Sequence, residues 1–286
     1  MAGRGRVEAS KCSGTVSRGP MRRCLLLLTL VLLTLGASQA GAQRQVTLRI
    51  VFPEGFSARQ MTDRVAEVRR IAIRKRGVTP RLSGDGYRTA VARASAPVAF
   101  RPHLKRRSVE GFLFPSLYEF TQSTSASALI ANQIATFERN WRSVNLRYAR
   151  GRNLNAYDVL IIASMVERET AVPAERKLVA AVIYNRLKAR MPLGIDATLR
   201  YGLGIQGTRP LRREHLRSTS PYNTRRYRGL PPTPIGNPGV ASMRAAARPA
   251  DVDYLYYVRK PNSLHHFFTA DYEEFCRKAR EYGYDC

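Results

Sequence analysis

One stretch of the chain, residues 157–170, limits the possible folds more than any other. It reads YDVLIIASMVERET and is apolar on almost every side from Val159 to Met165. Asn155, with Asp158 three positions later, has the spacing of a helix cap, which predicts that a helix begins here. A helix that is apolar all round must be enclosed by other elements. The sequence therefore predicts a domain built around a central, buried helix.

Two acidic residues, Glu167 and Glu169, close this apolar helix. Burial and the negative end of the helix dipole both disfavour an ionised carboxylate at such a position, which suits a proton donor near neutral pH. Residues two positions apart do not share a helix face, so only one of the two should point inward. The apolar face places Glu167 at its buried edge and turns Glu169 towards solvent or the following turn. The alternative is that both carboxylates only form ion pairs with Arg168, Arg176 or Arg186.

An N-terminal unit is predicted over residues 43–105. Residues 45–53 alternate apolar and polar side chains, which is typical of a strand, and a Pro-Glu-Gly turn follows. Ser57 then has the position of an N-cap for an amphipathic helix. This strand, turn and helix resemble the small LysM-like module of many cell-wall proteins. Residues 79–102 are rich in Pro, Gly, Ser and Ala, which places a domain boundary near residue 105.

The remaining residues, 106–286, are predicted to form a second domain of helices and short strands. Periodic apolar positions predict a helix over about 125–148 and another that starts at Pro173. A strand is expected at 254–258 and a last amphipathic helix from about Asp271. The fold class that follows is α+β, with a mixed, mainly helical domain behind a small α/β module.

The first 42 residues read as an export leader. From Met21 the order is two arginines, an apolar run of twelve residues from Cys24 to Leu35, and small residues that end in an Ala-x-Ala arrangement at Ala40 and Ala42. This order predicts a cleaved signal peptide or a single N-terminal membrane anchor, with Met21 as the true start. The run is shorter than the roughly 20 residues that cross a bilayer, so both alternatives stay open. Either one places the rest of the chain outside the cytoplasm.

Export also affects the cysteines outside the leader, Cys276 and Cys286. They are ten positions apart near the C-terminus, and in an oxidising compartment they could pair. The sequence leaves a disulfide and two free thiols equally open. It contains no CxxC or CxxH pair that would suggest a metal site.

The formal charge of +27 raises the question of nucleic-acid binding. The basic residues are 7 Lys and 41 Arg spread from end to end, which indicates a general preference for arginine rather than one binding patch. No RNP, KH or zinc-binding pattern is present, so we do not expect nucleic acid as a partner. Attraction to anionic lipid headgroups or an acidic cell-wall polymer fits the charge better.

Six separated segments carry a resemblance to one family. They read EGFLFPSLYEF (110–120), ASMVERET (163–170), YNRLKARMPL (184–193), DATLRYG (196–202), SPYNTRRYRGLPPTPIGNPG (220–239), and LYYV with HHFF (255–258 and 265–268). In this order they resemble the MltG-type (YceG-like) endolytic murein transglycosylases, over roughly residues 45–286. By this resemblance Glu167, the first Glu of the VERET segment, matches the catalytic glutamate of the family.

The resemblance implies a reaction in which peptidoglycan is cut between N-acetylmuramic acid and N-acetylglucosamine, ending nascent glycan strands. Glu167 would protonate the departing glycosidic oxygen, and its carboxylate would then take the proton of the muramyl 6-hydroxyl as that hydroxyl closes a 1,6-anhydro ring. Because the nucleophile belongs to the sugar, no second carboxylate is required, unlike in ordinary glycosidases. The resemblance implies no metal or organic cofactor, and it implies glycan strands and wall-synthesis enzymes at the membrane as partners. The alternative is a non-catalytic, peptidoglycan-binding scaffold of the envelope.

Further polar and aromatic residues could line a glycan groove. The candidates are Asp196, Thr198, Tyr222, Asn223, Thr224, Tyr118 and His265. The loop residues among them could hold hydroxyl and acetamido groups, Tyr118 could stack on a sugar, and His265 matches the H-x-F position of the family. The alternatives are loop architecture for the Asn and Thr side chains, a core position for Tyr118 and structural hydrogen bonds for His265.

Overall fold

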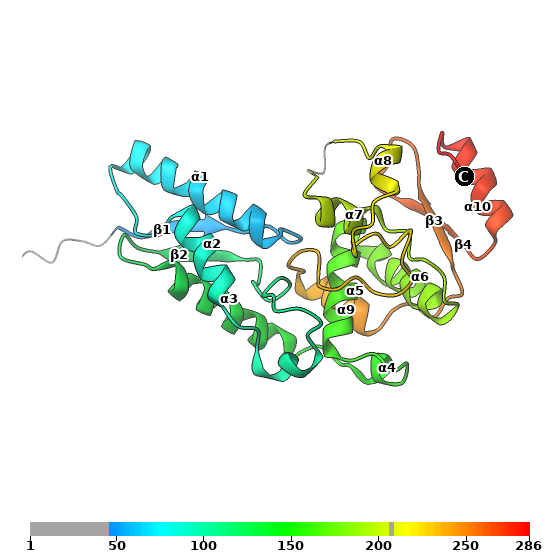
Figure 1. Cartoon of the computed structure of the whole chain (residues 1–286), viewed down its shortest axis with the longest axis horizontal. Helices are drawn as coiled ribbons and strands as arrows, with labels where there is room; N and C mark the ends of the chain where they lie inside the picture. The colour runs from blue at the N-terminus through cyan, green and yellow to red at the C-terminus, as the bar shows by residue number, and fades with distance from the viewer. Residues whose placement is uncertain (1–45, 206–208) are drawn as a thin grey trace, which may run out of the picture. The chain divides into compact units, whose positions relative to one another are not determined.

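The computed structural model describes residues 46–205 and 209–286 (Figure 1). The predicted leader, residues 1–42, lies outside the described residues. Within the described part of the chain, no helix combines the length and the apolar character needed to cross a bilayer.

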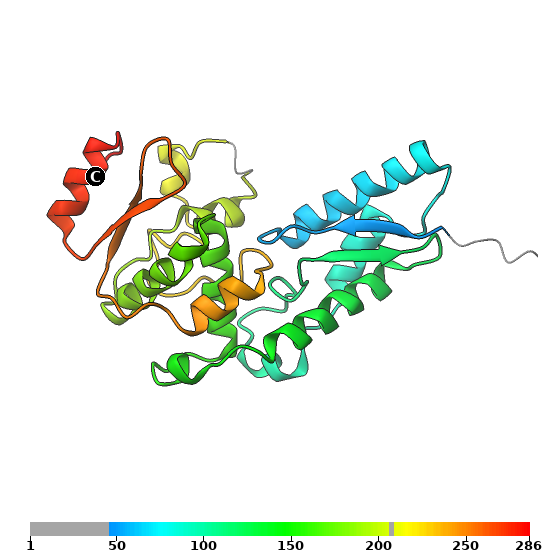
Figure 2. The same cartoon turned by 180° about the vertical axis from the view of Figure 1, so that it is seen from behind.

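The N-terminal part contains a two-stranded antiparallel sheet and two helices. Strand β1 (Leu48–Val51) pairs with β2 (Leu117–Phe120), and α1 (Ala58–Arg76) and α2 (Gly84–Arg93) follow β1 in the chain (Figures 1 and 2). Ser57 caps α1 as predicted, because its hydroxyl accepts a hydrogen bond from the Gln60 N–H while the Gln60 side chain accepts one from the Ser57 N–H. One buried cluster contains apolar side chains of the β1–β2 sheet, of α1 and α2, and of the helix that follows β2.

The stretch 79–102, rich in Pro, Gly, Ser and Ala, contains α2 and the short 3-10 helix η1 (Val98–His103). Ser83 acts as the N-cap of α2, and the buried Tyr87 donates a hydrogen bond to Gln133 Oε1 at 2.6 Å. Small residues of this stretch thus begin a helix. The boundary near residue 105 stays a prediction, but the β1–β2 sheet has one strand on each side of it.

The helix predicted over 125–148 is divided in the structure. Helix α3 (Ala126–Trp141) ends before a turn, and α4 (Arg147–Arg150) is a separate short helix. In the turn, the carbonyl oxygen of Asn140 accepts hydrogen bonds from the N–H and hydroxyl of Ser143, and Asn145 Oδ1 accepts one from Arg147 N–H. These local bonds replace helical ones, which the apolar periodicity alone does not reveal.

The second core surrounds α5 (Ala156–Glu169), the central helix predicted from the sequence. All residues from Tyr157 to Val166 are buried, and Asn155 and Asp158 form the expected capping box. Around α5 lie the helices α6 (Arg176–Lys188), which the 3-10 turn η2 (Pro173–Glu175) precedes, α7 (Asp196–Leu203) and α9 (Val240–Ala247) (Figure 1). The short α8 (Arg213–Leu216) lies in the loop region between α7 and α9.

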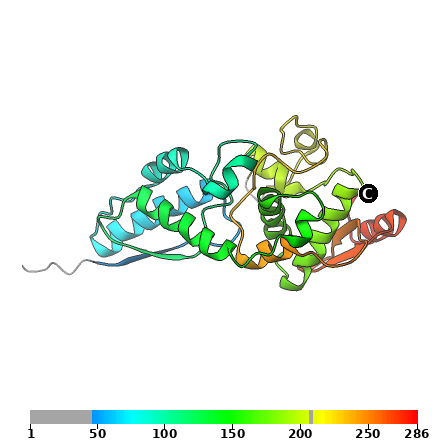
Figure 3. The same ribbon diagram turned by 90° about the horizontal axis from the view of Figure 1, so that it is seen from below.

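A second two-stranded antiparallel sheet, β3 (Tyr256–Arg259) with β4 (His266–Thr269), completes the fold. Helix α10 (Tyr272–Glu281), the expected last helix, packs on this sheet and has Asp271 as its N-cap (Figure 3). A disulfide joins Cys276 to Cys286 and closes the C-terminal segment onto α10. Helices combined with two small antiparallel sheets confirm the α+β class at this level of detail.

Candidate active site

The site begins at the C-terminal end of α5, where Glu167 lies. Its side chain is only 6% exposed, as the apolar face of the helix predicted. One carboxylate oxygen, Oε2, accepts a hydrogen bond from the backbone N–H of Gly239 at 2.9 Å, and the other, Oε1, lies 3.9 Å from Arg176 Nη2. The distance between Oε1 and Arg176 exceeds that of a charge-assisted hydrogen bond. Arg176 therefore attracts the carboxylate by its charge but does not form a hydrogen bond with Oε1.

A cavity of about 310 Å³ lies beside Glu167. Its walls come from the end of α5, the start of α6 and the β3–β4 hairpin. The lining residues are Glu167, Arg168, Glu169, Thr170, Ala171, Arg176, Arg259, Leu264 and His266. A buried carboxylate residue at the wall of a polar cavity has the position that a proton donor requires.

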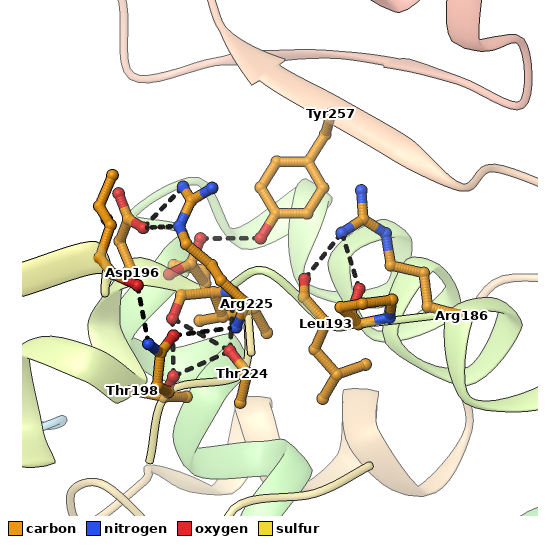
Figure 4. Close-up of polar contacts among 12 residues, drawn as sticks. Arg186, Leu193, Asp196, Thr198, Thr224, Arg225 and Tyr257 are labelled. Atoms are coloured by element: carbon orange, nitrogen blue, oxygen red, sulfur yellow. Dashed lines mark hydrogen bonds and ion pairs between the residues drawn. The ribbon is translucent and has the colours of Figure 1, made fainter. Parts of the chain in front are cut away.

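Glu169 does not point to solvent, and that part of the sequence prediction is wrong. Its Oε2 accepts a hydrogen bond of 2.7 Å from the hydroxyl of Tyr257, a residue of β3 labelled in Figure 4. Burial raises the pKa of Glu169, and the nearby charge of Asp196 raises it further, against the opposing effect of the Tyr257 hydrogen bond. The β3 strand covers the side of α5 that the helical pattern marked as exposed. The site therefore contains two enclosed carboxylates, on different sides of one helix.

The loop before α9 supplies the N–H group that holds Glu167. Ile235 N–H in this loop donates a hydrogen bond to the hydroxyl of the fully buried Ser164 in α5 at 3.0 Å. Ser164 also donates to the carbonyl oxygen of Ile161 at 2.7 Å, so both of its hydrogen-bonding roles are used. This pair of bonds fixes the loop against the central helix close to Gly239.

Asn237, in the same loop and fully buried, joins it to the N-terminal part of the chain. Its Oδ1 accepts hydrogen bonds from the N–H groups of Gly111 and Leu113, each at 2.9 Å. Its Nδ2 donates to Phe56 O and to Glu110 Oε1, each at 2.8 Å. Every hydrogen-bonding position of the amide is therefore occupied. The sequence placed Asn237 inside a family segment but gave no sign of these partners.

Glu110 is a second buried carboxylate that sequence reasoning did not identify. It accepts hydrogen bonds from the N–H of Ala58, at the start of α1, and from the hydroxyl of Tyr201, at 3.0 Å each. Burial raises its pKa to about 7, although these hydrogen bonds and that of Asn237 oppose the rise. Glu110 therefore links α1, α7 and the loop before α9 through a group that can titrate near neutral pH.

The two histidines of the HHFF segment differ in their places. His266 is buried and lines the cavity, and its Nδ1 lies 2.7 Å from Glu175 Oε2. His265 is 62% exposed in its side chain and lies 3.1 Å from Glu175 Oε1. Burial alone would raise the pKa of Glu175, but hydrogen bonds from His266 and His265 outweigh it and lower the pKa. The sequence singled out His265, whereas His266 is the histidine that reaches the cavity.

The expected groove residues Asp196, Thr198 and Thr224 lie together near the start of α7 (Figure 4). Asp196 is about half exposed and forms an ion pair of 2.7 Å with Arg225. Thr198 and Thr224 are buried, their hydroxyl oxygens lie 3.0 Å apart, and both donate to the carbonyl oxygen of Ile195. The two threonines therefore support the loop that leads into α7.

The other expected groove residues have separate surroundings. Asn223 is buried and donates to the carbonyl oxygens of Leu216, at the end of α8, and of Ser218. Tyr222 is partly exposed, packs edge to face with Tyr201, and has its hydroxyl 2.8 Å from that of Thr233. Tyr118 lies on β2 in the N-terminal core and donates to Phe114 O at 2.8 Å. Tyr118 thus occupies the core position that the sequence left as its alternative.

Comparisons relate this chain to known proteins of one family. The model of the YceG-like family matches residues 30–281. An endolytic murein transglycosylase of Bacillus subtilis is 34% identical over 157 residues, covering 55% of this chain and 43% of the relative, and one of Streptococcus pneumoniae R6 is 28% identical, covering 84% and 45%. The matched part therefore spans less than half the length of either relative. A 2.6 Å crystal structure of a YceG-like protein from Listeria monocytogenes superposes with a TM-score of 0.64 and 26% identity, covering 80% of this chain and 75% of that one. The family match extends over most of the chain, which therefore belongs to the YceG-like family.

Proposed function

We propose that this protein is an endolytic lytic transglycosylase of peptidoglycan, with Glu167 as its catalytic residue. The observation that carries the proposal is the place of Glu167. Its carboxylate is almost fully buried at the end of an apolar helix and accepts a hydrogen bond from a backbone N–H, and the residue lines a cavity. Relatives named endolytic murein transglycosylase support the reaction class.

The reaction needs one proton carrier. Protonated Glu167 donates its proton to the glycosidic oxygen as the bond between that oxygen and the anomeric carbon of N-acetylmuramic acid breaks. The carboxylate formed then accepts the proton of the muramyl 6-hydroxyl, whose oxygen bonds to the same anomeric carbon. Glu167 returns to its protonated state, and the products are a free 4-hydroxyl and a 1,6-anhydro end.

The surroundings of Glu167 suit the ionised state that exists between these two transfers. The Gly239 N–H donates to Oε2, and the guanidinium of Arg176 lies close enough to attract the negative charge. Both groups come from elements anchored to α5, so neither has to move far when the charge forms. Fixed donors of this kind stabilise a developing charge without a cost of reorganisation.

Among the candidate groove residues, we assign glycan contacts to those with exposed atoms. Asp196, Tyr222 and His265 retain exposed atoms, so we expect them to contact glycan or to border the groove. Thr198, Asn223 and Thr224 are expected to act by supporting the loop, because their polar atoms are used within the chain.

We also propose that the chain acts in the cell envelope, because peptidoglycan, its proposed substrate, lies there. A signal peptide or anchor within residues 1–42 would provide export, and the basic composition suits anionic surfaces. The strand, turn and helix at residues 48–76 support a LysM-like glycan-binding role for the N-terminal part. Wall-synthesis enzymes are the expected protein partners.

The test is replacement of Glu167 by Gln, which keeps the shape of the side chain but removes its titratable proton. Purified sacculi are incubated with the protein, and mass spectrometry counts new 1,6-anhydro ends. E167Q is expected to lose at least about a hundredfold in rate while it still folds and binds sacculi. The matched control is E138Q, at an exposed position of α3, which should retain full activity. Anhydro ends formed by E167Q at the normal rate would refute the proposal.

A further inference from the structure

Three arginines line the cavity beside Glu167, and the chain gives them little acidic company. They are Arg168, Arg176 and Arg259. Arg168 and Arg259 donate hydrogen bonds to backbone carbonyl oxygens, at 3.0 Å and 2.8 Å, which carry no charge. Among residues 46–205 and 209–286, the only ion pair that any of the three forms is the one between Arg176 and Glu167, at 3.9 Å. The cavity is therefore lined by more positive charge than the chain itself pairs.

Arg176 shows most clearly that a partner is missing from the chain. Its side chain is only 15% exposed, and its Nε is buried with no hydrogen-bond partner in the described ranges. Its Nη2 is too far from Glu167 for a hydrogen bond. A buried charged donor without an acceptor costs free energy, and native proteins keep such groups where a ligand or a function requires them. An anion bound in the cavity would supply acceptors to this guanidinium.

The acidic side chains near Arg176 offset its charge only weakly. Glu54, in the turn between β1 and α1, has its carboxylate against Gly239, and burial raises its pKa against the opposing effect of Arg176. Burial also raises the pKa of Glu169. In the proposed reaction Glu167 carries a proton when the substrate binds. The surroundings of the cavity therefore favour a negatively charged ligand.

We propose that the cavity is a carboxylate subsite, in which Arg176 and Arg259 bind a carboxylate carried by the muramyl unit of the substrate. Peptidoglycan offers two sources of this group. The lactyl ether of N-acetylmuramic acid has a free carboxylate when no peptide is attached, and an attached stem peptide has carboxylates of its own. The fork of a guanidinium matches a carboxylate in both geometry and charge. This inference rests on the proposed function, because it names the group that the same site recognises.

The test compares paired substrates on full-length protein, by kcat/KM for anhydro-end formation. One pair consists of strands without peptides, with the lactyl carboxylate either free or converted to its methylamide. The other pair consists of peptide-bearing strands, with the peptide carboxylates either free or methylamidated. The parent protein should prefer the free carboxylates of at least one pair by about tenfold. The pair that shows this preference identifies the source of the carboxylate.

Two variants assign the preference to the arginines. R176K keeps a positive charge beside Glu167 but removes the fork, and R259Q removes an exposed charge. Each should lower the preference towards one, mainly by raising KM for the free-carboxylate strands, and R176K should do so by about tenfold. Because the preference compares two substrates on one protein, a loss of folded protein or of a step common to both substrates cancels. The matched control is R88K, whose side chain is 71% exposed on α2 and which should keep the parent preference.

A parent preference near one in both pairs, or a preference that neither variant changes, would overturn the inference. An equal drop in R88K would also overturn it, because the effect would then not belong to the cavity. If the inference fails in one of these ways while E167Q is inactive on every strand, the proposed function stands. Anhydro ends formed by E167Q at the normal rate would instead refute the proposed function.

Discussion

Replacement of Asn237 by alanine should weaken the fold more than most single substitutions. The change would leave two buried N–H groups, those of Gly111 and Leu113, without an acceptor, and would remove one donor from Glu110. An unsatisfied buried group costs about 1–3 kcal/mol, so two N–H groups together predict a loss of about 4 kcal/mol in the free energy of unfolding. A cavity at a fully buried position adds to this loss.

The assay is urea unfolding followed by circular dichroism. With a slope of about 3 kcal/mol per molar urea, the midpoint should fall by more than about 1 M. The matched control is N132A, at an exposed position of α3, which should stay within about 0.5 kcal/mol of the parent protein. A loss in N237A no larger than that of the control would refute the claim that Asn237 joins the two parts of the chain.

Two further predictions concern titration and covalent linkage. Because burial raises the pKa of Glu110 from 4.5 to about 7, the folded chain keeps a proton that the unfolded chain releases, so this residue lowers stability as pH rises between those values. E110Q should remove this pH dependence, which amounts to about 3 kcal/mol over that range. If the unfolding free energies of the two proteins change in parallel with pH, the prediction is contradicted. The disulfide between Cys276 and Cys286 closes a short loop, so C286S should lower the free energy of unfolding by about 2–3 kcal/mol, mainly by loosening α10. Calorimetry with and without reductant measures this effect, and a parent protein insensitive to reduction would count against it.

The central helix could be predicted because its determinants are local. A capping pair at Asn155 and Asp158 marked its start, and an unbroken apolar run required that other elements cover it. Glu167 was placed correctly by the same reasoning, since its position relative to the apolar face follows from helical geometry. Local signals of this kind also identified the Ser57 cap and the start of the last helix near Asp271.

What the sequence could not predict depends on contacts between distant segments. Glu169 is enclosed because Tyr257, 88 positions later, covers it. Glu54 and Glu110 reach the site only because the loop around Asn237 binds the N-terminal part of the chain. Nothing in the local pattern of these residues separates them from exposed glutamates. The family segments that contain Glu110 and Glu169 were visible, but the partners that enclose these residues were not.

The most direct test of the central claim follows the oxygen of water. Purified sacculi are digested in ¹⁸O-labelled water by the parent protein and by E167Q, and the new glycan ends are analysed by mass spectrometry. If Glu167 transfers the proton and the muramyl 6-hydroxyl closes the ring, the parent protein should give unlabelled 1,6-anhydro ends and E167Q should give none. Reducing ends that carry ¹⁸O would show that water is the nucleophile, as in a hydrolysing glycosidase, and would contradict the account.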